Sequence, residues 1–237
     1  MDLKLNEEVI KAESDVFKML DDLLEQRDNE WWDKFYSNRS KPIPFFVEVP
    51  DENLVSFINT GVLKSGRVLD VGCGNGRNSV FLAQQGFKVD GIDFSASSID
   101  WANQMAEKKD VSVNFIDASF FDYDLELDSY DLIYDAGCLH HIKPHRRNQY
   151  LSKVSSLLKD DGHFGLTCFN LKGGANISDY DVYREYSMRG GLGFSSEKLE
   201  SVLNGYFQIS EIREMKEIID GSMFGKEFLW TAIMKKK

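Results

Sequence analysis

From residue 66 onward, short apolar runs alternate with segments whose apolar positions recur at helical spacing. This alternation is typical of a parallel α/β sheet, in which strands buried on both faces are joined by crossover helices. The expected strands are 67–71, 87–92, 111–116, 131–134, 162–169, 207–215 and 227–234. The expected helices are 77–85, 97–108 after a cap at Ser95, 146–158, and one from Ser195 or Ser196 to Leu203. The pattern predicts a doubly wound sheet with helices on both faces.

The first 60 residues do not follow this alternation. Leu5–Leu24 is predicted to be an amphipathic helix with one acidic face, and residues 31–36 an aromatic-rich connector. A short helix is expected over Asn53–Asn59, preceded by a cap at Asp51 and stopped by Gly61. These segments are interpreted as a helical and aromatic cap over residues 1–60.

Residues 170–194 form a second departure, because this stretch is rich in Gly and Tyr and is longer than a typical connection. No internal repeat or low-complexity linker separates it from the rest of the chain. We therefore expect one sheet domain over residues 61–237 that carries an insert near residues 170–194 on the side where a substrate would enter.

Composition and charge narrow the class of protein. With 237 residues, 42% hydrophobic and 28% charged, the chain has ordinary globular usage. No apolar run approaches the ~18 residues that a membrane span requires. The three cysteines lie far apart and form no Cys-x-x-Cys pair, which favours a location in the reducing cytoplasm and argues against a disulfide framework or a zinc site. The net charge of -11 disfavours nucleic-acid binding, which needs basic side chains against phosphates. These features favour a small-molecule partner and no membrane association.

A glycine-rich turn follows the first expected strand and opens the first expected helix of the sheet. A turn of this kind lets a ligand approach the backbone closely and faces the helix N-terminus towards a negative group. The third glycine of a dinucleotide fingerprint would stand where this chain has Arg77, which disfavours a nicotinamide cofactor. The turn reads Asp70-Val71-Gly72-Cys73-Gly74-Asn75-Gly76-Arg77.

Three acidic residues lie at the ends of three expected strands. Asp70 precedes the first glycine by two positions, where it can order the loop or meet an ammonium group. Asp93 follows Gly76 by 17 positions, where a carboxylate can accept hydrogen bonds from both ribose hydroxyls. Asp117 ends the third strand and can accept a hydrogen bond from an adenine amino group. Because ligands bind at the carboxyl edge of such sheets, the three residues together indicate a ligand with ribose, adenine and amino-acid parts.

These motifs resemble those of the class I S-adenosylmethionine-dependent methyltransferases, over residues 66–170 and again over the last strands. Leu69–Ser79 and Val89–Asp93 are particularly similar to the tellurite-resistance type and its thiopurine-methylating relatives. Asp131–Tyr134, followed by Gly137–Ile142, is similar to the fourth-strand motif of small-molecule methyltransferases. The resemblance implies a Rossmann-like, seven-stranded, mostly parallel sheet with an antiparallel last strand, and S-adenosylmethionine as cofactor. No Asn/Asp-Pro-Pro-Tyr/Phe motif follows the fourth strand, so methylation of nucleic-acid bases is not indicated.

The resemblance also implies which positions hold each part of the cofactor. The methionine part is assigned to Asp70 and the glycine loop, the ribose and one adenine face to the end of the second strand, and the adenine edge to the end of the third. Residues after the fourth strand are assigned to the methionine and sulfonium. The full set is Asp70, Gly72, Cys73, Gly74, Asp93, Phe94, Asp117, Ala118, Asp135 and Ala136.

The reaction implied is displacement of a methyl group from a sulfonium by an acceptor O, N, S or C atom. Alignment and desolvation can supply much of the rate, and a base is needed only where the acceptor must lose a proton. His140, His141 and Asp135 are the candidates for that base. A structural role for the histidine pair is the alternative, and a metal site is disfavoured because no third ligand has suitable spacing. His145 is expected at the surface.

We expect the acceptor pocket to be formed by residues 1–60 and 170–194, the two segments that do not follow the alternating pattern. The aromatic residues of 31–46 form either a lid or ordinary core packing, and Tyr36 and Arg39 are candidates for contact with the cofactor or substrate. Tyr183 of the insert is a further substrate-side candidate, with glycines at 190–193 as hinges.

Two other functions fit parts of the sequence. A nucleotide-dependent oxidoreductase shares the sheet but requires glycine at position 77. A catalytically silent partner protein that binds S-adenosylmethionine shares the motifs, and its acceptor cavity would be plugged or absent. The sequence leaves the acceptor and the oligomeric state open.

Overall fold

The computed structural model describes residues 9–24 and 27–237 and contains one seven-stranded sheet with the order β3-β2-β1-β4-β5-β7-β6. β1 to β5 are mutually parallel, whereas β7 runs antiparallel to both β5 and β6. The predicted mixed sheet with an antiparallel last strand is therefore confirmed. The strands are β1 (Arg67–Val71), β2 (Lys88–Asp93), β3 (Asn114–Asp117), β4 (Tyr130–Ala136), β5 (Leu158–Phe169), β6 (Phe207–Glu214) and β7 (Leu229–Lys236).

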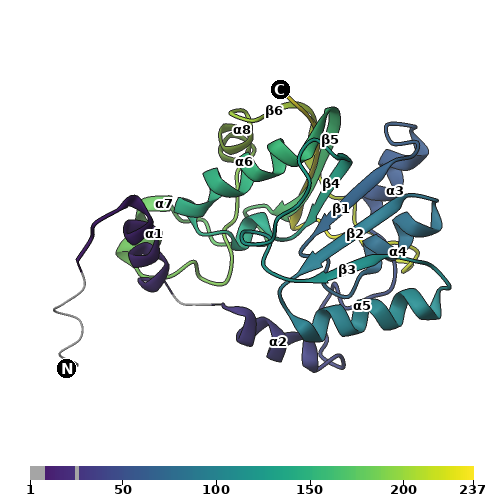
Figure 1. Cartoon of the computed structure of the whole chain (residues 1–237), viewed down its shortest axis with the longest axis horizontal. Coiled ribbons are helices and arrows are strands. Elements are labelled where there is room, and N and C mark those ends of the chain that lie inside the picture. Colours follow the sequence, from purple (N-terminus) through teal and green to yellow (C-terminus); the bar gives the residue numbers. More distant parts are fainter. Residues whose placement is uncertain (1–8, 25–26) are drawn as a thin grey trace.

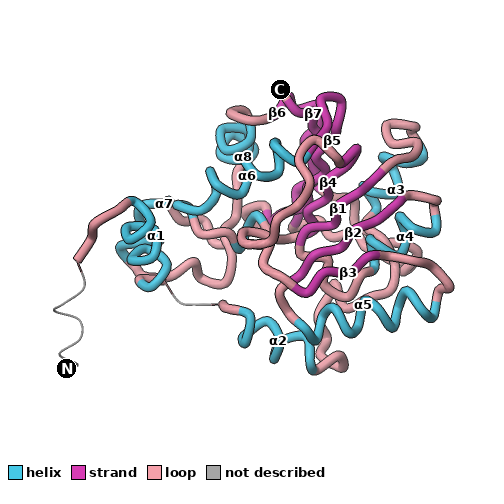
Figure 2. Tube along the Cα trace, in the orientation of Figure 1, coloured by secondary structure: helices cyan, strands magenta, loops and turns pink. Residues whose placement is uncertain are grey.

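Helices cover both faces of the sheet (Figure 1). Figure 2 shows the strands as one continuous layer between two groups of helices. One group packs against β1, β2 and β3, and the other against β5 and β6. The first group is α3 (Glu52–Asn59), α4 (Arg77–Gln84) and α5 (Ala96–Lys108), and the second is α6 (Arg147–Leu157) and α8 (Ser196–Leu203).

The core is divided by the sheet because successive side chains of a strand point to opposite faces. On β1 and β4, Leu69 and Ile133 join the cluster formed with α6 and α8, whereas Val68 and Leu132 join the cluster formed with α3 and α4. All four side chains are fully buried. This two-sided burial is why these strands appear in the sequence as continuous apolar runs rather than as an alternating pattern.

Most predicted elements of the sheet are confirmed, with shifts of a few residues at their ends. The first strand has the predicted bounds, and Ser95 accepts a hydrogen bond from the backbone N–H of Ser98, as expected of a helix cap. The fifth strand begins earlier than predicted, at Leu158, which pairs with Tyr130 across a register shift. The polar stretch 159–161 hid this extension because it lies at the exposed end of the strand.

Two predictions outside the sheet are wrong, and the insert contains an element that was not predicted. Residues 31–36 are not a connector but part of α2 (Asn29–Ser37), capped by the carboxylate of Asp28. The first helix, α1 (Glu13–Asp22), does not extend back over residues 9–12, because the Asp15 carboxylate accepts hydrogen bonds from the backbone N–H groups of Lys11 and Ala12. Residues 5–8 lie outside the described residues. The insert contains a short helix, α7 (Asp179–Arg184), capped by Ser178.

The N-terminal helices α1 and α2 lie beyond the carboxyl edge of the sheet. α1 contacts the 3-10 turn η3 (Pro144–Arg146) that precedes α6, and α2 packs on α5. In Figure 1, α1 lies beside α7 and apart from α2. Among the described residues, no helix combines the length and the apolar character that crossing a membrane requires.

Candidate active site

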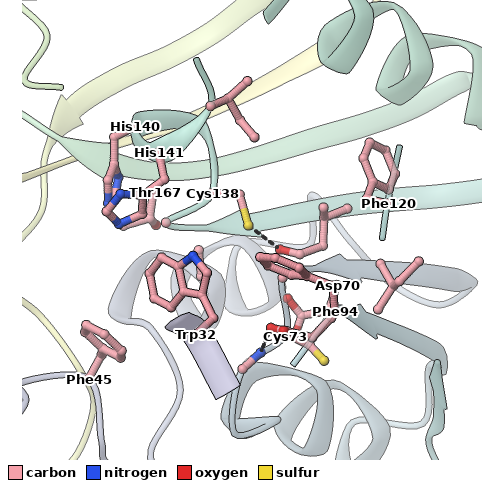
Figure 3. Close-up of a pocket in the computed structure, with 18 of the residues that line it drawn as sticks. Trp32, Phe45, Asp70, Cys73, Phe94, Phe120, Cys138, His140, His141 and Thr167 are labelled. Atoms are coloured by element: carbon pink, nitrogen blue, oxygen red, sulfur yellow. Dashed lines mark hydrogen bonds between the residues drawn. The ribbon is translucent and has the colours of Figure 1, made fainter. Parts of the chain in front are cut away.

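A cavity of about 840 Å³ opens at the carboxyl edge of the sheet. Its walls come from the glycine loop after β1, the ends of β2, β4 and β5, the segment after β3, and α2. Figure 3 shows Asp70, Cys73 and Phe94 towards one end and His140 and His141 towards the other, with Trp32 between them. The cavity therefore joins the predicted cofactor residues to the predicted base candidates.

The glycine loop lies against the cavity in a backbone conformation that other residues rarely adopt. Gly72, Gly74 and Gly76 have φ values of 63°, 54° and 77°. A Cβ atom at Gly74 would lie 2.6 Å from the hydroxyl oxygen of Tyr36, and one at Gly76 would lie 2.8 Å from the Cβ of Ala102. Glycine is required at these positions both by the φ angles and by the close approach of the neighbouring helices.

Asp93 lies at the end of β2 and is almost fully buried. Its carboxylate accepts hydrogen bonds from the backbone N–H of Gly74 at 3.0 Å and of Ser95 at 2.9 Å. Burial raises the pKa of this carboxyl, although the two backbone hydrogen bonds oppose the shift. Asp93 thus fixes the glycine loop to β2, and each of its oxygens keeps a lone pair for a further donor.

Asp70 lines the cavity and is incompletely hydrogen-bonded. Its Oδ2 atom accepts a hydrogen bond from the Ser79 hydroxyl at 2.6 Å, whereas its buried Oδ1 atom has no hydrogen-bond partner among the described residues. Burial raises the pKa of the Asp70 carboxyl to about 7, with the Ser79 hydrogen bond opposing the shift. An oxygen such as Oδ1, in the wall of a cavity, can accept a hydrogen bond from the ammonium group of a methionine moiety. The polar groups of the site therefore suit S-adenosylmethionine.

Asp135 does not have the arrangement expected of a base. Its carboxylate accepts hydrogen bonds from the backbone N–H groups of Gly137, Cys138 and Leu139 and from the Tyr150 hydroxyl, at 2.6–3.0 Å. The residue is fully buried and is not part of the cavity wall. Burial raises its pKa to about 6 against these four hydrogen bonds. Asp135 holds the turn that carries the two histidines.

The remaining predicted cofactor residues separate into two groups. Cys73, Phe94, Ala118 and Ala136 line the cavity. Asp117 is exposed and does not line it, although it pairs with Asp93 in the β2–β3 register.

His140 and His141 lie in the 3-10 turn η2 (Leu139–His141) and line the cavity. The Nδ1 atom of His140 accepts a hydrogen bond from the backbone N–H of Phe169 at 3.3 Å, and its ring stacks on the Phe169 ring. Burial lowers the pKa of His140 well below its usual range and that of His141 to about 3, and the Arg27 charge acts in the same direction. Both rings are therefore neutral at pH 7, and His140 carries its proton on Nε2.

The predicted lid residues occupy different positions. Tyr36 is buried and lines the cavity, whereas Arg39 pairs with Asp100 at 2.8 Å on the surface of α5 and does not reach it. Tyr183 is also outside the cavity wall, and its hydroxyl is 2.7 Å from Nδ1 of His145. The side chain of His145 is 6% exposed rather than at the surface, because the N-terminal helix covers it.

The sequence did not reveal how the N-terminal segments contribute to the cavity. Trp32 of α2 lies 5.2 Å from the His141 ring, centroid to centroid. Asp21 of α1 forms ion pairs with Lys143 and Arg146. Arg27, between the two helices, also lines the cavity. No motif marks these contacts, since each joins residues more than 100 positions apart.

Comparison with known proteins agrees with the geometry. A family model described as a methyltransferase domain matches residues 68–162. An uncharacterized methyltransferase of Schizosaccharomyces pombe is 29% identical over 121 residues, which is 51% of this chain and 83% of the relative.

Solved structures share the fold. A 1,6-didemethyltoxoflavin-N1-methyltransferase from Burkholderia thailandensis, with its acceptor and S-adenosylhomocysteine bound, superposes with a TM-score of 0.64 at 18% identity, covering 98% of this chain and 93% of that one. A TehB-like methyltransferase from Corynebacterium glutamicum superposes with a TM-score of 0.55 at 20% identity, covering 88% and 98%. Residues 68–162 are thus identified as a methyltransferase domain, and the chain around them has the fold of the S-adenosylmethionine-dependent methyltransferases.

Proposed function

We propose that this enzyme methylates a small-molecule acceptor bound in the same cavity as the cofactor. The observation that carries the proposal is the continuity of the cavity from Asp70 and Asp93 to His140, His141 and Trp32. Its 840 Å³ volume is in the range of small-molecule sites, and it is open where a catalytically silent protein would be plugged. The Burkholderia relative in fold, with a small acceptor bound, supports the same class of substrate.

In this proposal the cofactor occupies the end of the cavity formed by the glycine loop. Asp70 Oδ1 holds the ammonium group, Asp93 accepts hydrogen bonds from the ribose, and Phe94 and Ala118 flank the adenine, with Asp117 at its edge. When bound, the cofactor supplies an activated methyl group on a sulfonium. The remaining work of this chain is to align the acceptor and to exclude water.

His140 has a defined part in this arrangement. Because its Nδ1 atom accepts a backbone hydrogen bond, its Nε2–H can donate to the acceptor but cannot take a proton from it. We propose that His140 orients the acceptor, and that His141, neutral at pH 7, is the remaining base candidate.

The division of the chain is part of the same proposal. Within residues 1–60, proposed as the N-terminal cap, α1 and α2 cover the site, whereas α3 packs on the sheet. Residues 61–237 form the methyltransferase domain, and residues 170–194 its substrate-side insert. A cytoplasmic location fits the three free cysteines.

Cofactor affinity is expected to depend on pH through Asp70. Its pKa of about 7 in the free protein means that lowering the pH from 8 to 6 protonates the carboxyl that must hold the ammonium group. Affinity for S-adenosylhomocysteine should therefore weaken by about tenfold over this range. Calorimetric titrations of the wild type and of Asp70→Asn test this, and the variant should bind more weakly with a flatter pH profile. An equally steep profile in the variant would show that another group titrates.

The same substitution should stabilise the protein without cofactor. The folded pKa of about 7 lies above the value of 3.8 for an unperturbed carboxyl, so the stability cost of Asp70 develops as the pH rises from 4 to 7 and is complete above pH 7. Asp70→Asn should raise the free energy of unfolding at pH 8 by on the order of 1–3 kcal/mol. Denaturant melts at pH 8 and pH 5 check this, with a smaller difference expected at pH 5.

The acceptor class is tested by following S-adenosylhomocysteine formation from S-adenosylmethionine. Adding the fraction of a cell extract below about 1 kDa should stimulate the reaction, and adding nucleic acid or protein fractions should not. Stimulation by a macromolecular fraction alone would contradict the proposal.

A further inference from the structure

We propose that the acceptor is a planar conjugated anion, such as an acidic phenol or enol, whose ring lies between aromatic side chains and whose charge is held by Arg27. This inference rests on the proposed function, because it names the substrate of the same cavity. We call the end of the cavity near His140 and His141 the acceptor end. The inference follows from the shape of this end, from its charge, and from the kind of methyl transfer that an apolar site favours.

Flat side chains line the acceptor end of the cavity. The His140 ring stacks on Phe169 with centroids 3.8 Å apart, and Trp32 meets His141 edge to face at 5.2 Å. Gly191 lies against these rings, because a Cβ there would be 3.0 Å from Phe169 and 3.2 Å from His141. We call this group the aromatic chamber, and its members are Trp32, Phe45, His140, His141, Phe169 and Phe228. A planar ligand makes the largest contact with walls of this kind.

Arg27 brings to the chamber a positive charge that forms no ion pair with a carboxylate of residues 9–24 or 27–237. Its guanidinium donates a hydrogen bond to the backbone oxygen of Gly190 at 2.8 Å and lies over the Trp31 ring. Gly190 precedes the glycine that packs on His141 and Phe169, which places Arg27 beside the chamber. The pKa values of His140 and His141 are both lowered in part by the Arg27 charge, which agrees with this placement.

The other cations of the cavity wall are paired with carboxylates. Arg77 lies 2.5 Å from Asp51, Lys143 and Arg146 both pair with Asp21, and Lys172 pairs with Glu214. Within residues 9–24 and 27–237, Arg27 is the lining Lys or Arg side chain for which no carboxylate lies at ion-pair distance. Such a guanidinium favours an anionic oxygen, which it can bind in the plane of its N–H groups.

The chemistry favours an anion for a second reason. The lone pair of the acceptor oxyanion forms the new bond to the methyl carbon as the carbon–sulfur pair returns to sulfur, so an anion and a sulfonium become two neutral products. A charge-cancelling step is accelerated in apolar surroundings, where water does not stabilise the separated charges. A neutral amine would instead become a cation near Arg27. Since both histidines are neutral, an acceptor that arrives as the anion needs no base.

Three probes of similar size separate charge from planarity in protein saturated with S-adenosylhomocysteine. They are 2-naphthoate, a planar anion; 2-naphthamide, its neutral counterpart; and decahydronaphthalene-2-carboxylate, a non-planar anion with the same carbon skeleton. Calorimetry should show that 2-naphthoate binds at least about tenfold more tightly than 2-naphthamide, as one charge-assisted hydrogen bond predicts. It should also bind more tightly than the non-planar anion, which cannot lie flat against the aromatic side chains. Arg27→Gln should remove the preference for naphthoate over naphthamide, and Arg27→Lys should keep most of it. Arg39→Gln, which changes a surface ion pair outside the cavity, should leave all three affinities unchanged.

The outcomes distinguish this inference from the proposed function. Equal affinity for naphthoate and naphthamide, a preference that survives in a folded Arg27→Gln variant, or no binding of any probe would overturn the inference. If S-adenosylhomocysteine itself failed to bind in the first titration, the proposed placement of the cofactor would fail. Thermal melts of each variant establish that it is folded.

Discussion

Replacing Asp93 by alanine is expected to weaken binding of S-adenosylhomocysteine by on the order of 10²–10⁴-fold. The Asp93 carboxylate fixes the glycine loop through Gly74 and is assigned both ribose hydroxyls. Two charge-assisted hydrogen bonds of about 1.5–3 kcal/mol each give a loss of this size. Calorimetric titration of the purified variant measures it directly.

Two further variants serve as controls for this result. Asp117→Asn should weaken binding by no more than about tenfold, because Asp117 is exposed and a solvated hydrogen bond contributes about 0.5–1.5 kcal/mol. Asp100→Ala, on the outer surface of α5, should change nothing measurable. A folded Asp93→Ala protein that binds S-adenosylhomocysteine as tightly as the wild type would refute the assignment of Asp93 to the ribose.

The second large effect is on stability. Asp135→Ala is expected to lower the free energy of unfolding by about 3–5 kcal/mol, because three backbone N–H groups and the Tyr150 hydroxyl lose their shared acceptor in the core. For a chain of this length, the melting temperature should fall by roughly 6–20 °C.

The matched control is Asp160→Ala, since Asp160 is fully exposed and its pairing with Lys236 is long, at 3.9 Å. That change should stay within about 0.5 kcal/mol. A Tm of Asp135→Ala close to that of the wild type would mean that the turn carrying His140 and His141 is held by other contacts. Calorimetric or spectroscopic melts at pH 7.5 distinguish these results.

The sheet could be predicted because its signals are local in the sequence. The bounds of the first strand and the Ser95 cap depend on neighbouring residues, and the structure confirms both. The helical state of residues 31–36 could not be predicted in the same way. It depends on Asp28 as a cap and on packing against α5, more than 60 positions away.

The cofactor end of the site could be predicted because its residues stand at fixed spacings within and after the glycine loop. Asp70, Gly72, Gly74 and Asp93 were found from their spacing and lie together at one end of the cavity. The role of Arg77 was missed, because the sequence showed only that a third glycine was absent. In the structure Arg77 forms a buried ion pair with Asp51, which also accepts a hydrogen bond from the Tyr134 hydroxyl.

Arg27 illustrates the same limit, because it lies in a segment without a recognisable motif and contacts Gly190, more than 100 positions away. For Trp32 the sequence predicted a place in a lid or in the core, but not its contact with His141, which is equally distant along the chain. The acceptor end of the cavity is assembled from such contacts, whereas the cofactor end follows from the ends of adjacent strands.

The most direct test of this account is a crystal structure of the protein with S-adenosylhomocysteine. We expect the ribose hydroxyls within hydrogen-bond distance of Asp93, the amino group at Oδ1 of Asp70, and the sulfur facing the aromatic chamber. A ligand bound in the opposite direction, with its adenine among Trp32, His141 and Phe169, would contradict both the cofactor placement and the acceptor site.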